Sequence, residues 1–287
     1  MRVIVAVVVC ASLAWAEGAG SVAFRAVDRK TGAPVAGLQA ADIEIREGKD
    51  LRPVTSLRFG DIPMDLVLVL DAGQDTVDIS RDVALGARLA CSEMAAGDRL
   101  ALITFTSGWK VRFRFLGKEN ELSRKIERSV SASTTWFRGQ KVFDAIQAAV
   151  DLFPAPPDAA RTRAVLAITN SLDRDSKAAP AAIVAAARQR DAAVFTVSVP
   201  TARPNVPGVP IGRSVGPVAE QLEQITQPTG GESRVQRGSG YILRENLERI
   251  RSRYVASYVA ASGARPVVRL SPAGAIAFPN AEIRGAW

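Results

Sequence analysis

The stretch that decides the fold is Asp65-Leu66-Val67-Leu68-Val69-Leu70-Asp71. Its unbroken apolar run, rich in β-branched residues, predicts a strand that is buried on both faces of a parallel sheet. Such a strand delivers its terminal carboxylate, Asp71, to the carboxyl edge of the sheet, where open α/β sheets bind ligands. The next residues, Ala72-Gly73-Gln74-Asp75, lack both serines of an Asp-x-Ser-x-Ser loop that would cradle magnesium. The stretch therefore predicts the scaffold of a metal site without much of its chemistry.

Strands and helices alternate on the carboxyl-terminal side of this stretch. Apolar or alternating segments predict strands at 100–105, 111–115, 165–169 and 193–199, the first two as a hairpin. Apolar stripes at helical spacing predict helices at about 77–95, 122–130, 142–153, 178–190, 217–227 and 241–252. The alternation predicts the α/β class: a doubly wound, mostly parallel sheet with helices on both faces.

Both ends of the chain read as extended structure. Strands are predicted at 22–27, 43–46 and 54–59, then at 254–259, at 266–270 and from Ala275 toward Trp287. The leading segment alone, with about 40 residues, buries too little surface to be stable. We therefore expect both ends to form one small immunoglobulin-like β unit into which the α/β domain is inserted. The expected divisions are 17–62 for the first β segment, 63–252 for the α/β domain and 253–287 for the second β segment.

The first residues have the pattern of an export signal. Arg2 precedes an apolar core, and Ala14-Trp15-Ala16 fits the small-x-small rule for cleavage, so we expect residues 1–16 to be a signal peptide. The core is shorter than the about 20 residues that span a bilayer, and no later segment is apolar enough to be a transmembrane anchor. We expect an exported protein, either periplasmic or secreted, whose mature chain starts at Glu17.

The residue inventory excludes several catalytic mechanisms. The chain has no histidine, which removes Ser-His-Asp and Cys-His catalysis, histidine zinc sites and histidine general bases. Cys10 lies in the signal segment, without the small preceding residue of a lipoprotein. Cys91 lies in an apolar helical stretch and reads as a small buried hydrophobe, with an intermolecular disulfide or a nucleophilic role as the alternative. Asp71 and Asp75 resemble a glycosidase carboxylate pair, but no sugar-binding aromatic platform accompanies them, so we expect no enzyme.

The formal net charge of +8 would suggest nucleic-acid binding in an intracellular protein. The arginines are scattered along the chain rather than gathered with aromatic residues on one stripe, and the export signal argues against this partner. We expect no nucleic-acid partner, and acidic polymers of the cell surface are the weaker alternative.

Several short motifs, in their order and spacing, resemble the von Willebrand factor type A domain, in the form found in exported bacterial VWFA-related proteins. They are Gly32 to Leu38, Asp42 to Gly48, Asp65 to Asp71, Gly97 to Phe105, Val142 to Ile146, Thr229-Gly230-Gly231, the Arg253-Tyr254 strand and the closing Arg284-Gly285-Ala286-Trp287. The resemblance covers nearly the whole mature chain. It implies the α/β fold that the alternation of strands and helices also predicts.

The resemblance further implies the position of a metal-ion-dependent adhesion site. In that family the site takes an Asp and two Ser from the first loop, a Thr before the third helix and an Asp after the fourth strand, and magnesium keeps one position open for a carboxylate of the partner. The matching positions here are Asp71, Gly73, Asp75, Gln140 and Asn170, of which all but the first are substituted. We therefore expect a degenerate adhesion site without bound metal or cofactor. An altered calcium-like site of the remaining oxygens is the alternative.

These expectations combine into a functional hypothesis. We expect a non-enzymatic exported module that binds another protein in the periplasm or at the cell surface through the loops at 72–77, 131–140, 170–177 and 200–216. Trp136 and Arg138 are residue types enriched at binding hot spots, although packing under the loop explains Trp136 and Phe137 equally well. The alternative is a structural component of a cell-envelope assembly that contacts its partners through the β unit.

Overall fold

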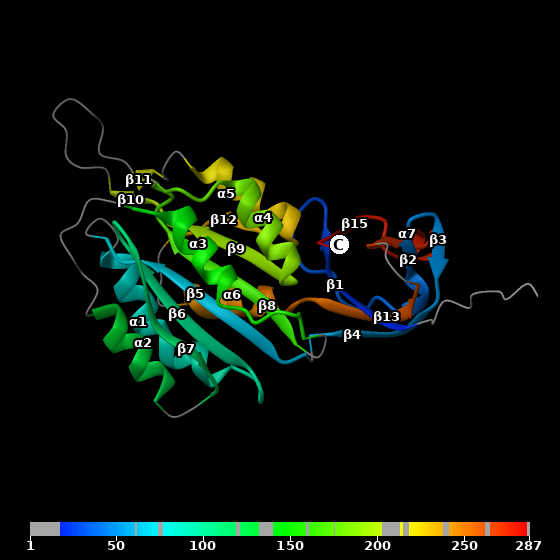
Figure 1. The fold of residues 1–287 in the computed structure, drawn as a ribbon, viewed down its shortest axis with the longest axis horizontal. Helices are drawn as coiled ribbons and strands as arrows, with labels where there is room; N and C mark the ends of the chain where they lie inside the picture. Colours follow the sequence, from blue (N-terminus) through cyan, green and yellow to red (C-terminus); the bar gives the residue numbers. More distant parts are fainter. Residues whose placement is uncertain are drawn as a thin grey trace, which may run out of the picture.

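The computed structural model describes residues 18–60, 62–73, 77–118, 121–131, 140–158, 161–174, 176–202, 213–214, 218–237, 241–261 and 265–285. Figure 1 shows a larger α/β part joined to a smaller β unit, with β1, β4 and β13 lying toward the junction. The expected signal segment, Asp75, Trp136, Phe137 and Arg138 lie outside the described residues.

A six-stranded sheet, in the order β12-β9-β8-β5-β6-β7, forms the centre of the larger part. Its strands are β5 (Met64–Asp71), β6 (Arg99–Phe105), β7 (Trp109–Leu116), β8 (Thr162–Thr169), β9 (Ala192–Ser198) and β12 (Ser233–Val235). All neighbours are parallel except the β6–β7 hairpin. Every residue of β5 is buried, which confirms the strand covered on both faces. The sequence did not predict β12, whose three residues extend the sheet beyond β9.

Helices cover both faces of this sheet (Figure 1). They are α1 (Val77–Ser92), α2 (Leu122–Ser131), α3 (Val142–Asp151), α4 (Pro180–Gln189), α5 (Ala219–Thr226) and α6 (Ile242–Arg251). Leu66, Leu68 and Leu70 pack with α1, α2 and α6, while Val67 and Val69 pack with α3, α4 and α5. Alternate residues of one strand therefore supply two separate cores, and the doubly wound α/β prediction is confirmed. None of the helices in the described ranges is both long and apolar enough to cross a bilayer.

The β unit is built by strands from both ends of the chain. One sheet has the order β15-β1-β13-β4 and the other the order β14-β2-β3. Their strands are β1 (Gly18–Asp28), β2 (Ile43–Glu47), β3 (Asp50–Arg52), β4 (Val54–Phe59), β13 (Tyr254–Ala260), β14 (Pro266–Leu270) and β15 (Ala281–Arg284). Phe24, Ile45, Tyr254 and Val268 share one buried core between the sheets. Pairing of the two ends thus follows the prediction, because each sheet contains strands from both.

The end of the chain departs from the sequence prediction. Instead of one long strand from Ala275, the structure has helix α7 (Pro272–Ala277) followed by the short strand β15. The Ser271 hydroxyl caps this helix by accepting a hydrogen bond from the Gly274 amide at 3.0 Å, and Pro272 occupies the first turn. A Ser cap followed by Pro is a favourable helix start, and it outweighs the alternating apolar pattern that suggested a strand.

The segment predicted to be irregular after β9 contains a two-stranded ribbon of β10 (Thr201–Ala202) and β11 (Arg213–Ser214). Short 3-10 turns complete the fold as η1 (Ala40–Asp42) and η3 (Gln227–Thr229). Cys91 is buried in α1 against the sheet, in agreement with its reading as a small hydrophobe. Burial, and then the charge of Glu127, raise the pKa of its thiol to about 11.

Candidate functional site

Asp71 ends β5 at the carboxyl edge of the central sheet and is fully buried. Its Oδ1 accepts a hydrogen bond from the Gly73 amide at 3.1 Å, and its Oδ2 accepts one from the Thr169 hydroxyl at 3.2 Å. The Gln140 side-chain amide lies at 3.5 Å from Oδ1 with its nitrogen, Nε2, toward the carboxylate. A buried carboxylate needs such donors because burial without hydrogen bonds is costly. Among the described residues, neutral groups of three separate segments therefore contact this charge.

Gln140 and Asn170 reach the same edge from α3 and β8. Gln140 precedes α3, is 4% exposed, and its carbonyl accepts a hydrogen bond from the Arg174 amide at 2.6 Å. Asn170 follows β8 and is fully buried; its Oδ1 accepts from the Leu172 amide at 3.1 Å. Its Nδ2 is buried without a hydrogen-bond partner among the described residues. The sequence-predicted positions Asp71, Gly73, Gln140 and Asn170 thus meet at the carboxyl edge.

The loop after β8 is fixed to the start of α3. Asp144, in the first turn of α3, accepts hydrogen bonds at Oδ1 from the amides of Lys177 and Ala178 at 2.7 and 2.8 Å. Asp173 accepts from the Ser176 hydroxyl at 2.6 Å and the Phe143 amide at 3.4 Å. These carboxylates hold backbone in place, so the described part of this loop is a structured surface.

The described residues do not fit the magnesium site that the fold implies. Magnesium requires hard oxygen ligands in near-octahedral geometry. Gly73 has no side-chain oxygen, Gln140 turns its amide nitrogen toward Asp71, and the side-chain oxygen of Asn170 accepts a backbone amide. In the described ranges no group of three or more cysteine, aspartate and glutamate side chains could hold a metal ion.

Two polar residues of the site carried no distinct sequence signal. Thr169 donates to the Asp71 carboxylate, and Ser80 of α1 donates to the Asp71 carbonyl at 3.3 Å. A threonine at the end of a strand reads as an ordinary strand residue because of its high β propensity. A hydroxyl next to the predicted carboxyl edge is the only clue that could have identified Thr169 from the sequence.

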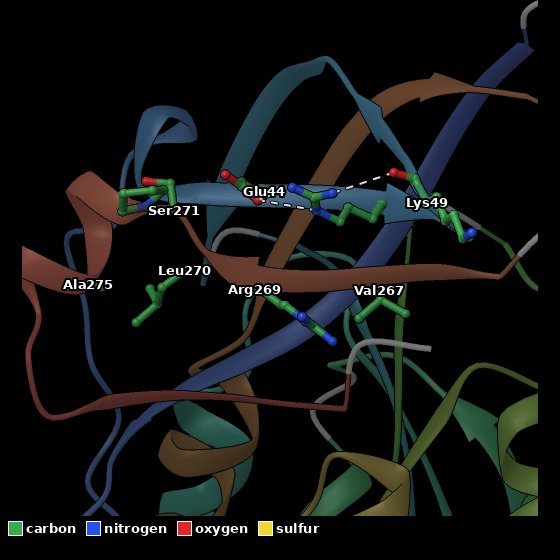
Figure 2. Close-up of a pocket in the computed structure, with 10 residues that line it drawn as sticks. Glu44, Lys49, Val267, Arg269, Leu270, Ser271 and Ala275 are labelled. Atoms are coloured by element: carbon green, nitrogen blue, oxygen red, sulfur yellow. Dashed lines mark hydrogen bonds and ion pairs between the residues drawn. The ribbon is translucent and has the colours of Figure 1, made fainter.

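The β unit carries a second candidate surface, an open groove of about 670 Å³ along β2, β14 and the start of α7 (Figure 2). Arg46 in the groove donates to Glu44 at 3.2 Å and to the Lys49 carbonyl at 3.4 Å. The side chains of Lys49 and Arg269 also line the groove and have no ion-pair partner within the described part of the chain. Val267, 42% exposed, adds an apolar contact area between these cations.

No family model matches the sequence, and no curated protein sequence matches it. Among solved structures, a von Willebrand factor type A protein from Catenulispora acidiphila superposes with a TM-score of 0.50 at 10% identity, over 95% of this chain and 72% of that chain. The proximal thread matrix protein 1 of the mussel byssus, with a zinc-occupied adhesion-site motif, superposes with a TM-score of 0.50 at 13% identity, over 74% of this chain and 50% of that one. BatB from Bacteroides thetaiotaomicron superposes with a TM-score of 0.49 at 17% identity, over 65% of this chain and 98% of that one.

The first two superpositions each reach a TM-score of 0.50. At these identities, structural likeness concerns the fold alone. The chain has the fold of the von Willebrand factor type A domain.

Proposed function

We propose that this chain is a non-enzymatic, exported protein-binding module that contacts its partner through the carboxyl edge of the central sheet without a metal ion. The observation that carries the proposal is the environment of Asp71, whose two carboxylate oxygens accept hydrogen bonds from Gly73 and Thr169. In an adhesion site that uses magnesium, the corresponding oxygens would face the cation. Hydrogen bonds from the chain itself take that place here.

The same edge supplies an accessible surface for a partner. Open α/β sheets bind their ligands at the carboxyl ends of the strands, and the loop after β8 presents the exposed side chains of Arg174 and Lys177 there. The backbone of this loop is held by Asp144 and by the Gln140 carbonyl. A rigid loop with exposed cations suits recognition of a protein surface that carries carboxylates, because little ordering entropy is lost on binding.

Cross-linking in cells that export the tagged protein, followed by mass spectrometry of the adducts, tests the proposal. We expect the yield of the principal adduct to fall at least ten-fold in the double variant Arg174→Glu and Lys177→Glu, because the reversed charges repel an acidic partner. EDTA should leave the wild-type adduct unchanged. The matched control is Lys49→Glu with Arg269→Glu, which makes the same charge change in the groove of the β unit.

A second function is favoured by that groove. In this alternative, the chain is a structural component of a cell-envelope assembly, and partners dock on the β unit. The double variant of Lys49 and Arg269 would then lose the adduct while the variant of Arg174 and Lys177 retains it. Retention of the adduct by both variants would contradict both functions, and its loss with EDTA would contradict metal independence.

A further inference from the structure

Three arginines are buried where the β unit meets the amino edge of the central sheet. Arg25 lies in β1, Arg163 is the second residue of β8, and Arg253 immediately precedes β13. Their exposed fractions are 0%, 2% and 2%. Arginine is almost never buried this completely unless it is paired. We call these three residues the junction cluster.

Two of these charges lie at the junction of β1 with the start of β13. Phe24 pairs with Tyr254 in the antiparallel β1–β13 ladder. Arg25 directly follows Phe24, and Arg253 directly precedes Tyr254, so the two arginines are neighbours across the two segments. Arg253 also reaches β8, where its Nη1 donates to the Arg163 carbonyl at 3.1 Å. Like charges in neighbouring strand positions repel. Consistently, burial, and then the charges of Arg253 and Arg249, lower the pKa of Arg25 against the opposing effect of Glu232.

Only part of the positive charge of the junction cluster is paired with a carboxylate at close range. Within the described ranges, Glu232 is the one carboxylate at ion-pair distance, with its Oε2 at 3.2 Å from Arg25 Nη2. The same carboxylate is shared with Arg249 at 3.3 Å and Arg234 at 3.5 Å. Asp191 attracts Arg163 and Arg253 electrostatically, although neither arginine forms an ion pair with a described residue. One shared ion pair and Asp191, which lies beyond ion-pair distance, therefore leave part of the charge of the three buried arginines unbalanced.

The cluster also has hydrogen-bond donors without acceptors. Nε and Nη1 of Arg25, Nε of Arg163 and Nε of Arg253 are buried and lack a partner among the described residues. The Arg25 guanidinium lies 5.1 Å from the Phe195 ring centroid. The face of the ring attracts the positive charge, but it does not accept hydrogen bonds from the N–H groups in the plane of the guanidinium. A buried charged donor without an acceptor is strongly unfavourable, so these groups require an additional acceptor.

We propose that the junction cluster binds one small monovalent anion, of the size of chloride, between Arg25 and Arg253. Its charge would balance the excess of arginine, and its surface would accept the N–H groups that have no partner. A compact ion suits the site because all three side chains are buried. The site joins β1 and β13 to the central sheet, so the anion would stabilise the contact between the β unit and the α/β part. The proposal is independent of the proposed function.

Thermal unfolding of the mature protein at fixed ionic strength tests the proposal, with sodium chloride replacing sodium gluconate. We expect the melting temperature to rise and then level off, by roughly 5 °C at 100 times the dissociation constant. Formate and acetate arms distinguish a halide site from a carboxylate site. A melting temperature that is unchanged by every anion, or that rises equally with all of them and without saturation, would overturn the proposal.

Variants connect this effect to the cluster. Arg253→Met should abolish the chloride-dependent rise, whereas Arg58→Met, an exposed arginine in β4 of the same sheet, should retain it. If Arg253→Met does not fold, bromide soaked into crystals of the wild-type protein tests the same site by anomalous diffraction. An anomalous peak between Arg25 and Arg253 supports the proposal, and water density there without bromide overturns it.

Discussion

The buried carboxylates at the two edges of the central sheet have different hydrogen-bond partners. At the amino edge, Asp65 is fully buried and is bound by two arginines, with Oδ1 at 2.8 Å from Arg99 Nε and at 2.6 Å from Arg161 Nη2. At the carboxyl edge, Asp71 is equally buried but takes its hydrogen bonds from amides and a hydroxyl. The strand β5 thus carries one carboxylate in an ion-pair network and one whose described hydrogen bonds come from neutral groups.

This difference indicates a division of roles. The amino edge also holds Asp98, which accepts from the Met64 and Ala95 amides at 2.9 and 2.7 Å and pairs with Arg251. The contacts of Asp98 thus join the start of β5 to the segment after α1 and to the end of α6. At the carboxyl edge, the loop after β8 carries the exposed side chains of Arg174 and Lys177. The buried ion pairs of β5 therefore lie at one edge, and the surface that we propose for recognition lies at the other.

The largest expected effect tests how tightly the amino-edge side of the sheet is packed. A Cβ at Gly231 would lie 1.7 Å from the Val194 carbonyl oxygen, so Gly231→Ala must displace β9 or the segment before β12. We expect a loss of about 3 kcal/mol in the free energy of unfolding. The control is Gly108→Ala in the β6–β7 turn, where a Cβ meets nothing within 4 Å. Urea unfolding of both variants measures the difference, and equal stability would contradict the comparison.

The next effect concerns the carboxyl edge. The quadruple change Gly73→Ser, Asp75→Ser, Gln140→Thr and Asn170→Asp restores the ligand types of the adhesion site. We expect magnesium to stabilise this variant by about 2.7 kcal/mol at 100 times its dissociation constant, and to leave the wild-type melting temperature unchanged. Thermal unfolding with and without magnesium makes the measurement. Wild-type protein that is stabilised by millimolar magnesium would contradict the degenerate site, and a folded quadruple variant without response would contradict the placement of these loops.

The sequence was sufficient for the elements that periodicity defines. The unbroken apolar run of β5 predicted burial on both faces, and the order of motifs placed Asp71, Gln140 and Asn170 at one edge. It was insufficient where tertiary contacts decide. The three residues of β12 are too few to show a period, and the cap at Ser271 prevailed over an alternating pattern in α7. The expected domain divisions remain our proposal.

The junction cluster shows a different reason for failure. Arginine in a sequence reads as a surface residue, because it is mostly exposed in folded proteins. Arg25 and Arg253 are more than 200 positions apart in the chain, as are Arg25 and Glu232, which are separated by 207 positions. Only the pairing of β1 with β13 brings the two arginines together. No local pattern contains that information.

The smallest expected effect comes from the direct comparison of the two carboxylates. Asp65→Asn leaves Arg99 and Arg161 without their counter-charge, and breaking a buried pair costs about 3–5 kcal/mol. Because the Arg99 side chain is 42% exposed, water screens part of this loss, and we expect about 2 kcal/mol. Asp71→Asn keeps one acceptor oxygen and meets no arginine among its described contacts, so we expect roughly 1 kcal/mol.

The pH dependence separates the two cases further. Burial alone would raise the pKa of Asp65, but the hydrogen bonds from Arg99 and Arg161 reverse that effect and lower it below its usual value of 3.8. A lowered pKa means that the folded state holds the proton less tightly than the unfolded state. The stabilising contribution of Asp65 is therefore present above about pH 4 and is lost as the pH falls through its folded-state pKa. Wild-type and Asp65→Asn proteins should converge in stability under acid, measured by urea unfolding between pH 7 and pH 2. A constant difference across this range would show that the ion pairs at the amino edge do not account for the cost of the substitution.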